Sequence, residues 1–122
     1  MNLSWIFTLL VTLIAVEHIL IGLGEMFGSS ELQANAFEMD PKFLAQKNAK
    51  IALGNQGIYN IMLGIIILII LFFIEVPVSV FQIFMFFIMA VGIYGGFTAT
   101  RKIWFTQALP ALIVLILLFF VK

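Results

Sequence analysis

Four long apolar stretches constrain this chain more than any other feature of its sequence. They cover residues 3–26, 51–74, 77–99 and 103–121. A helix needs about 20 mostly apolar residues to cross roughly 30 Å of hydrocarbon, so each stretch has about the length of a membrane span. The stretches also lack the alternation of polar and apolar residues that a membrane β-barrel requires. We therefore predict an all-α integral membrane protein, in which residues 1–122 form one four-helix bundle domain.

The composition excludes the common soluble classes. Hydrophobic residues make up 64% of the 122 residues and charged residues 10%, whereas soluble domains contain about 45–50% and 25%. A small soluble fold cannot bury so much apolar surface, which excludes a soluble enzyme or a nucleic-acid-binding protein. Six basic residues balance six acidic ones, and there is no cysteine. We expect the lipid bilayer as a partner, no nucleic acid, no metal and no cofactor.

The connections between the stretches predict the topology. Glu75-Val76-Pro77 and residues 100–102 are short turns, so the second, third and fourth helices are expected to be antiparallel neighbours. Only residues 27–50 form a long loop. Asp40 is suited to cap a helix and Pro41 to occupy its first position, which predicts a partly helical, interfacial loop.

The same loop is expected to lead directly into the second helix, which would then begin before Ile51. Phe43, Leu44, Lys47 and Lys50 would lie along the membrane surface, with the lysine side chains extended towards water.

Basic residues near the helix ends predict the orientation. The connections at residues 27–50 and 100–102 lie on one side, and that side carries the basic residues Lys42, Lys47, Lys50, Arg101 and Lys102. The side with both termini carries only Lys122. The positive-inside rule therefore places these two connections in the cytoplasm and both termini outside a cell membrane.

Polar side chains gather in the cytoplasmic half of the predicted bundle. The candidate ligand-binding residues are Glu17, His18, Glu25, Asn55, Gln56, Tyr59, Asn60, Tyr94 and Gln107. An ionisable group inside a span costs at least about 2.5–3.5 kcal/mol on insertion scales, so such residues call for an explanation. A polar pocket is one interpretation. The alternatives are a solvated or capping role for Glu25, and hydrogen bonds that join helices for Glu17 and His18.

The second helix carries the densest part of this polar layer. Asn55 and Tyr59 form one stripe, and Gln56 and Asn60 form the adjacent one. Four such groups need partners in a medium without water, so we expect the cluster to face the first helix.

Small residues and a proline mark the packing of the last two helices. Gly92 and Gly96 form a small-xxx-small pair that lets another backbone approach, within the chain or in a second copy. Pro110 has no N–H to bond the Thr106 carbonyl, so a kink is expected there.

Several of these motifs also carry a family resemblance. They are Asn55-Gln56-Gly57-Ile58-Tyr59-Asn60, Gly92-Ile93-Tyr94-Gly95, Arg101-Lys102 and Gln107-Ala108-Leu109-Pro110-Ala111. Together with a first helix that bears Glu and His, they resemble a bacterial family of small four-helix membrane proteins, catalogued as domain of unknown function 1304. The resemblance covers nearly the whole chain and implies a single four-helix membrane domain. It implies no established activity.

Three functions are compatible with the polar layer. The first is binding or transport of a small cationic or amphipathic molecule. An embedded carboxylate in a four-helix protein is similar to the small multidrug-resistance transporters, although the long first loop and the His beside Glu17 depart from them. The second is a structural or accessory subunit, in which the polar layer joins helices. The third is an acid–base enzyme using His18, Tyr59 and either Glu17 or Glu25 on a lipophilic substrate.

Overall fold

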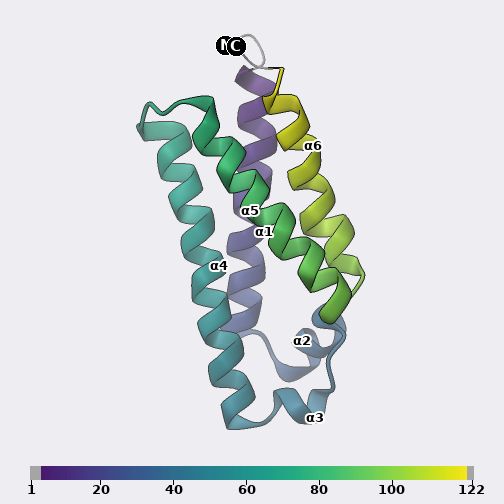
Figure 1. Ribbon diagram of the computed structural model, residues 1–122. Helices are drawn as coiled ribbons and strands as arrows, with labels where there is room; N and C mark the ends of the chain where they lie inside the picture. Colours follow the sequence, from purple (N-terminus) through teal and green to yellow (C-terminus); the bar gives the residue numbers. More distant parts are fainter. Residues whose placement is uncertain (1–3, 121–122) are drawn as a thin grey trace. The chain divides into compact units, whose positions relative to one another are not determined.

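The computed structural model describes residues 4–120, and this part of the chain is helical without any strand. The elements are α1 (Ser4–Phe27), α2 (Ser30–Phe37), α3 (Pro41–Leu44), α4 (Lys47–Phe73), α5 (Val78–Thr98), the π-helical segment η1 (Trp104–Ala108) and α6 (Leu109–Leu118) (Figure 1). Among the described residues, α1, α4 and α5 are long and apolar enough to cross a membrane. The expected fourth span corresponds to a shorter apolar helix, Trp104–Leu118. The all-helical class is therefore confirmed.

The polar connection between α1 and α4 contains two short helices. The predicted cap of α3 is confirmed, because the Asp40 side chain accepts a hydrogen bond of 2.9 Å from the Lys42 N–H and Pro41 opens the helix. α4 begins at Lys47, before Ile51, as expected. The surface position expected for Leu44 is wrong, because this side chain is only 1% exposed. The helix α2 was not expected from the sequence; Ser29 caps its N-terminus, because the Ser29 side chain accepts a hydrogen bond of 3.1 Å from the Leu32 N–H.

The chain divides into two compact units. The central unit is Ala15–Ile66, and the terminal unit combines Met1–Ile14 with Ile67–Lys122. α1 and α4 each contribute residues to both units.

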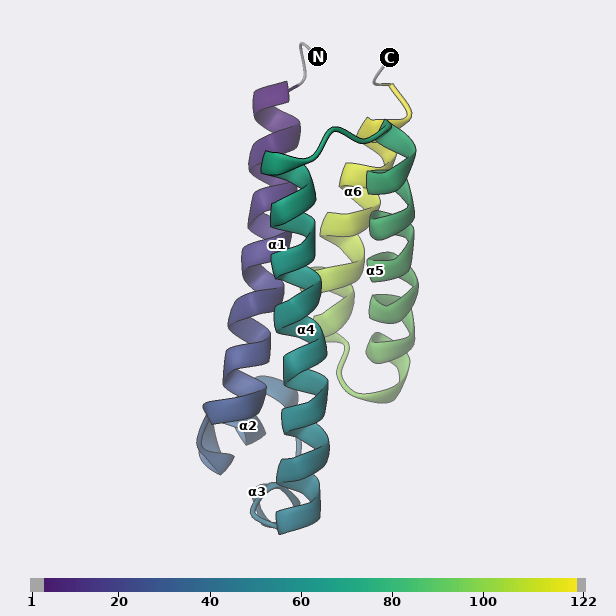
Figure 2. The same cartoon turned by 90° about the vertical axis from the view of Figure 1, so that its left-hand side faces the viewer.

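Small residues bring α1 and α4 together within the central unit. A Cβ atom placed on Gly57 would lie 2.7 Å from the Gly22 carbonyl oxygen, and one placed on Gly64 would clash with the Ala15 carbonyl oxygen. Ala15 and Gly22 are seven residues apart, as are Gly57 and Gly64. This spacing keeps both pairs on one seam, as in left-handed helix packing. The two helix segments accordingly lie side by side, with α2 and α3 near the C-terminal end of α1 (Figures 1 and 2).

In the terminal unit, α5 packs against η1 and α6 (Figure 2). Gly92 and Gly96 are buried on this face, and a Cβ atom on Gly92 would lie 2.9 Å from the Ala108 nitrogen. A Cβ atom on Gly96 would overlap the Trp104 ring. The close approach expected from the small-xxx-small pair is confirmed within the chain.

A π-helical turn replaces regular α-helix immediately before Pro110. The Leu109 N–H donates to the Trp104 carbonyl, five residues back, instead of four. A single π turn inside an α-helix is one recognised way to disturb its hydrogen-bond ladder, as a proline also does. The expected irregularity at Pro110 thus takes the form of a π-helical segment.

Candidate functional site

The most enclosed carboxylate of the central unit is Glu25, in the last turn of α1. Its side chain is 3% exposed, and its Oε1 accepts a hydrogen bond of 2.6 Å from the Asn60 amide on α4. The Gln56 amide, one turn earlier on α4, is a second hydrogen-bonding neighbour. Two neutral amides from one helix therefore hold a carboxylate from the other. Asn60 is half-buried and Gln56 is exposed, so one side of the site lies at the surface of the unit.

Gln33 on α2 completes this group of polar residues. Its Nε2 donates to the Gly24 carbonyl at 3.0 Å and to the Glu25 carbonyl at 3.2 Å. The last carbonyls of a helix have no partner within the helix, so Gln33 caps the C-terminus of α1. The Gln33 side chain is 3% exposed, and its buried Oε1 finds no partner among the described residues. We refer to Glu25, Gln33, Gln56 and Asn60 as the Glu25 cluster.

Close helix packing explains why the cluster forms at this position. A Cβ atom on Gly57 would lie 2.6 Å from Met26 Cγ and 3.1 Å from Glu25 Cβ. Only glycine allows α4 to approach the end of α1 this closely, and the approach brings Asn60 within reach of Glu25. On the loop side, Lys50 Nζ donates to Ser30 Oγ at 2.9 Å and joins the start of α4 to α2. These contacts fix the elements that carry the cluster.

Glu17 and His18 lie on the same helix, two turns before Glu25. His18 is 3% exposed. Glu17 is half-buried, and its buried Oε1 finds no hydrogen-bond partner within the described part of the chain. His18 is thus buried, and Glu17 is partly buried.

The two polar stripes of α4 face different ways. The expectation that they face the first helix holds for Gln56 and Asn60 and is wrong for Asn55 and Tyr59. Asn55 is exposed and donates to the Ile51 carbonyl of its own helix at 2.9 Å. Tyr59 is 78% exposed. Of these four residues on α4, Gln56 and Asn60 thus face α1, whereas Asn55 and Tyr59 face outward.

The remaining candidates, Tyr94 and Gln107, belong to the terminal unit. Tyr94 on α5 is 71% exposed, and Gln107 in η1 is half-buried. The neighbouring Trp104 donates from Nε1 to the Ile93 carbonyl at 3.1 Å and stacks edge-to-face on Phe97. No group of three or more His, Asp or Glu side chains suited to a metal occurs within residues 4–120.

The geometry defines an all-helical protein with three helices of membrane-spanning length and a carboxylate–amide cluster between two of them. The family described as "Protein of unknown function (DUF1304)" matches residues 12–119, and the chain belongs to this family. It is also similar to "Uncharacterized protein YpaA" of Lactococcus lactis subsp. lactis (strain IL1403), with 31% identity over 113 residues, which cover 92% of this chain and 95% of that protein. No solved structure matches the chain.

Proposed function

We propose that this chain is a multi-pass membrane protein that binds a small cationic or amphipathic molecule at the Glu25 cluster. The observation that carries the proposal is the burial of the Glu25 carboxylate against two neutral amides. A buried anion is costly unless it is paired, and neutral amides supply hydrogen bonds but no opposite charge. A bound cation would supply that charge.

The hydrogen-bonding capacity of the cluster supports a ligand of this kind. A carboxylate has about four lone-pair positions, and the two amides use only part of them. The Gln33 Oε1 atom adds an acceptor without a partner among the described residues. A ligand with positive charge or N–H donors would satisfy these acceptors, and the exposed Gln56 marks the side from which it would enter.

The placement of the site in a membrane is part of the proposal. The length of α1, α4 and α5 and their apolar composition support it. With the connections at residues 27–50 and 100–102 in the cytoplasm, the Glu25 cluster lies near the cytoplasmic face. Because the chain has no cysteine, single cysteines at Asn2 and at the exposed Asn35 report the topology without background. We expect a membrane-impermeant maleimide to label Asn2→Cys from outside intact cells and Asn35→Cys only after lysis; the reverse pattern would overturn the orientation.

The binding experiment uses tetraphenylphosphonium, a lipophilic cation, as the probe. Its effect on melting temperature is measured in an uncharged detergent for the wild type, Glu25→Gln and the control Glu31→Gln, which alters an exposed glutamate of α2. We expect the probe to stabilise the wild type and the control but not Glu25→Gln. If no variant responds and Glu25→Gln unfolds in the absence of the probe, the cluster serves helix packing, as in an accessory subunit.

The acid–base enzyme receives less support from the geometry. Tyr59, which the sequence suggested as a member of the catalytic set, is exposed on the outward-facing side of α4. His18 and Glu25 are seven residues apart on α1, about 10 Å along the helix axis. This distance is too long for a direct proton transfer between the two side chains.

A further inference from the structure

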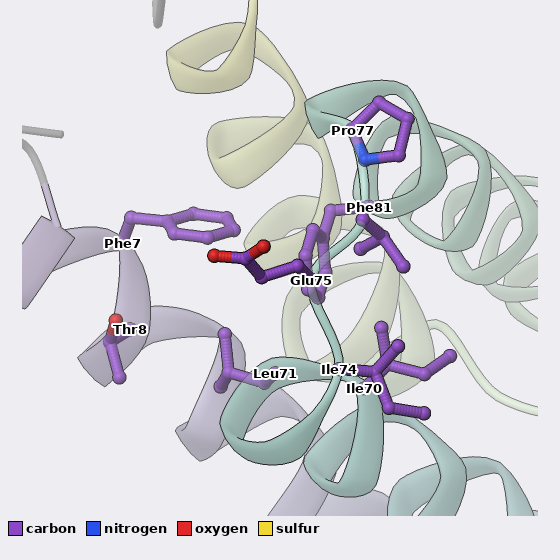
Figure 3. Close-up of a pocket in the computed structure, with 9 residues that line it drawn as sticks. Phe7, Thr8, Ile70, Leu71, Ile74, Glu75, Pro77 and Phe81 are labelled. Atoms are coloured by element: carbon purple, nitrogen blue, oxygen red, sulfur yellow. The ribbon is translucent and has the colours of Figure 1, made fainter.

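The terminal unit contains an open pocket of about 530 Å³ at the turn between α4 and α5. Figure 3 shows this pocket, with Phe7 and Thr8 of α1 on one side and Glu75, Pro77 and Phe81 on the other. Its volume falls within the range of about 300–1,000 Å³ that is typical of small-molecule sites. We call it the Glu75 pocket.

Glu75 is the one charged side chain among the nine described residues that line the pocket, and none of the nine is basic. The described basic residues of this unit, Arg101 and Lys102, follow the other end of α5. α5 has 21 residues, which corresponds to about 30 Å at 1.5 Å per residue. Neither residue can neutralise Glu75 across this distance, so within residues 4–120 of this unit no basic side chain lies close enough to pair with Glu75.

Apart from Glu75 and Thr8, the side chains that line the pocket are apolar. Phe7 and Phe81 stack edge-to-face with their ring centroids 5.2 Å apart, and both are nearly buried. In Figure 3 the Glu75 carboxylate is directed from the turn towards Phe7. A single carboxylate beside aromatic rings is a poor site for an inorganic cation, because Ca²⁺ takes 6–8 oxygen ligands and Mg²⁺ demands an octahedral shell. It suits a cation that carries its own apolar groups, since aromatic rings attract such cations.

We propose that the Glu75 pocket binds an organic ammonium group, with Glu75 as its counter-ion and Phe7, Phe81 and Pro77 contacting its carbon substituents. A free quaternary ammonium ion such as choline and the headgroup of a choline phospholipid share this chemistry. The site lies in the terminal unit and uses none of the residues of the Glu25 cluster. The two sites can therefore be tested separately.

The first experiment compares choline with 3,3-dimethyl-1-butanol, which has the same shape without the charge. The melting temperature of the wild-type protein is measured in an uncharged maltoside detergent with each compound at increasing concentration. We expect a saturable rise with choline and no rise with the neutral analogue. An equal response to both compounds would overturn the role of charge, and this comparison needs no variant to fold.

The second experiment assigns the effect to Glu75. Glu75→Gln removes the charge with little change of shape, Glu31→Gln removes an exposed charge elsewhere, and Glu25→Gln removes the carboxylate of the other site. We expect the choline response to disappear only in Glu75→Gln. Loss of the response in Glu25→Gln with retention in Glu75→Gln would overturn the assignment to this pocket.

A third measurement separates the two sources of the ammonium group. Native mass spectrometry of protein taken from mixed vesicles compares retention of phosphatidylcholine with retention of phosphatidylglycerol. Preferential retention of phosphatidylcholine that Glu75→Gln abolishes identifies a lipid headgroup. A choline response without lipid retention identifies a soluble quaternary ammonium ion, and the absence of both overturns the proposal.

Discussion

Asn60 Nδ2 donates a hydrogen bond of 2.6 Å to Glu25 Oε1, joining α4 to the last turn of α1 across 35 residues of sequence. The bond forms beside the close contact of Gly22 with Gly57. The carboxylate is thus held beside one of the close contacts between the two helices. Both the packing of the central unit and the proposed ligand site depend on this position.

Replacing Asn60 by leucine should weaken the central unit through Glu25. The change removes a charge-assisted hydrogen bond to a buried carboxylate, with an expected loss of about 1–2 kcal/mol in the free energy of unfolding. In a Glu25→Leu background the same substitution should cost less, because the acceptor is absent. Unfolding in mild detergent, analysed as a double-mutant cycle, measures this coupling, and strictly additive effects would contradict a direct interaction.

Replacing two glycines of α4 by alanine should change the stability of the protein in opposite directions. At Gly57 the new methyl group meets the Gly22 carbonyl oxygen, so Gly57→Ala should destabilise the protein by about 1–3 kcal/mol. At Gly54 nothing lies within 4 Å of the new atom. Gly54→Ala should therefore stabilise the helix by roughly 0.5–1 kcal/mol. Melting temperatures of the two variants, three residues apart on one helix, give the comparison; equal effects would argue against the close contact of α1 with α4.

The side-chain amide of Gln33 should be required for the stability of the C-terminus of α1. Gln33→Leu loses both bonds to the Gly24 and Glu25 carbonyls, while Gln33→Glu places an acceptor against two acceptors. We expect both variants to be destabilised, with faster amide hydrogen exchange around the C-terminus of α1. The exposed Asn35 on the same short helix provides the control, since Asn35→Leu should leave that exchange unchanged.

The packing of Gly96 on Trp104 predicts compensation between two variants. A methyl group at position 96 overlaps the indole ring, so Gly96→Ala should destabilise the terminal unit. Trp104→Leu also destabilises it, because the bond to Ile93 and the contact with Phe97 are lost. The double variant should melt higher than the sum of the two losses implies, because the smaller side chain makes room for the methyl group. If the losses in melting temperature of the two single variants simply add in the double variant, positions 96 and 104 are not in contact.

The sequence predicted features that depend on local chemistry. Long apolar runs give the helices, Asp40 and Pro41 give the start of α3, and the pair Gly92/Gly96 gives a close helix contact. Each of these signals is read from neighbouring residues. These local features depend little on how segments that are distant in the sequence pack against one another.

Features that depend on distant contacts were not predictable in this way. α4 is apolar on all sides beyond Asn60, so its hydropathy did not reveal that Tyr59 faces outward while Asn60 faces α1. In the sequence, Gln33 is one polar residue among others in a polar loop. Only the reversal of the chain after Gly28 places it against the end of α1, where it donates to the Gly24 carbonyl. The Glu75 pocket likewise requires Phe7 beside a turn almost 70 residues later. The acidic Glu31 and the cap residue Ser29 were the available signal for α2.

Glu25 is proposed to bind a cationic ligand, and the ¹³C resonance of the Glu25 carboxyl carbon tests this binding most directly. We would label the protein with ¹³C at its glutamate side chains, assign the Glu25 and Glu31 carboxyl resonances from Glu25→Gln and Glu31→Gln, and titrate tetraphenylphosphonium. We expect a saturable shift of the Glu25 resonance at probe concentrations that leave the resonance of the exposed Glu31 unchanged. A Glu25 resonance that does not move, or that moves only as Glu31 does, would contradict it.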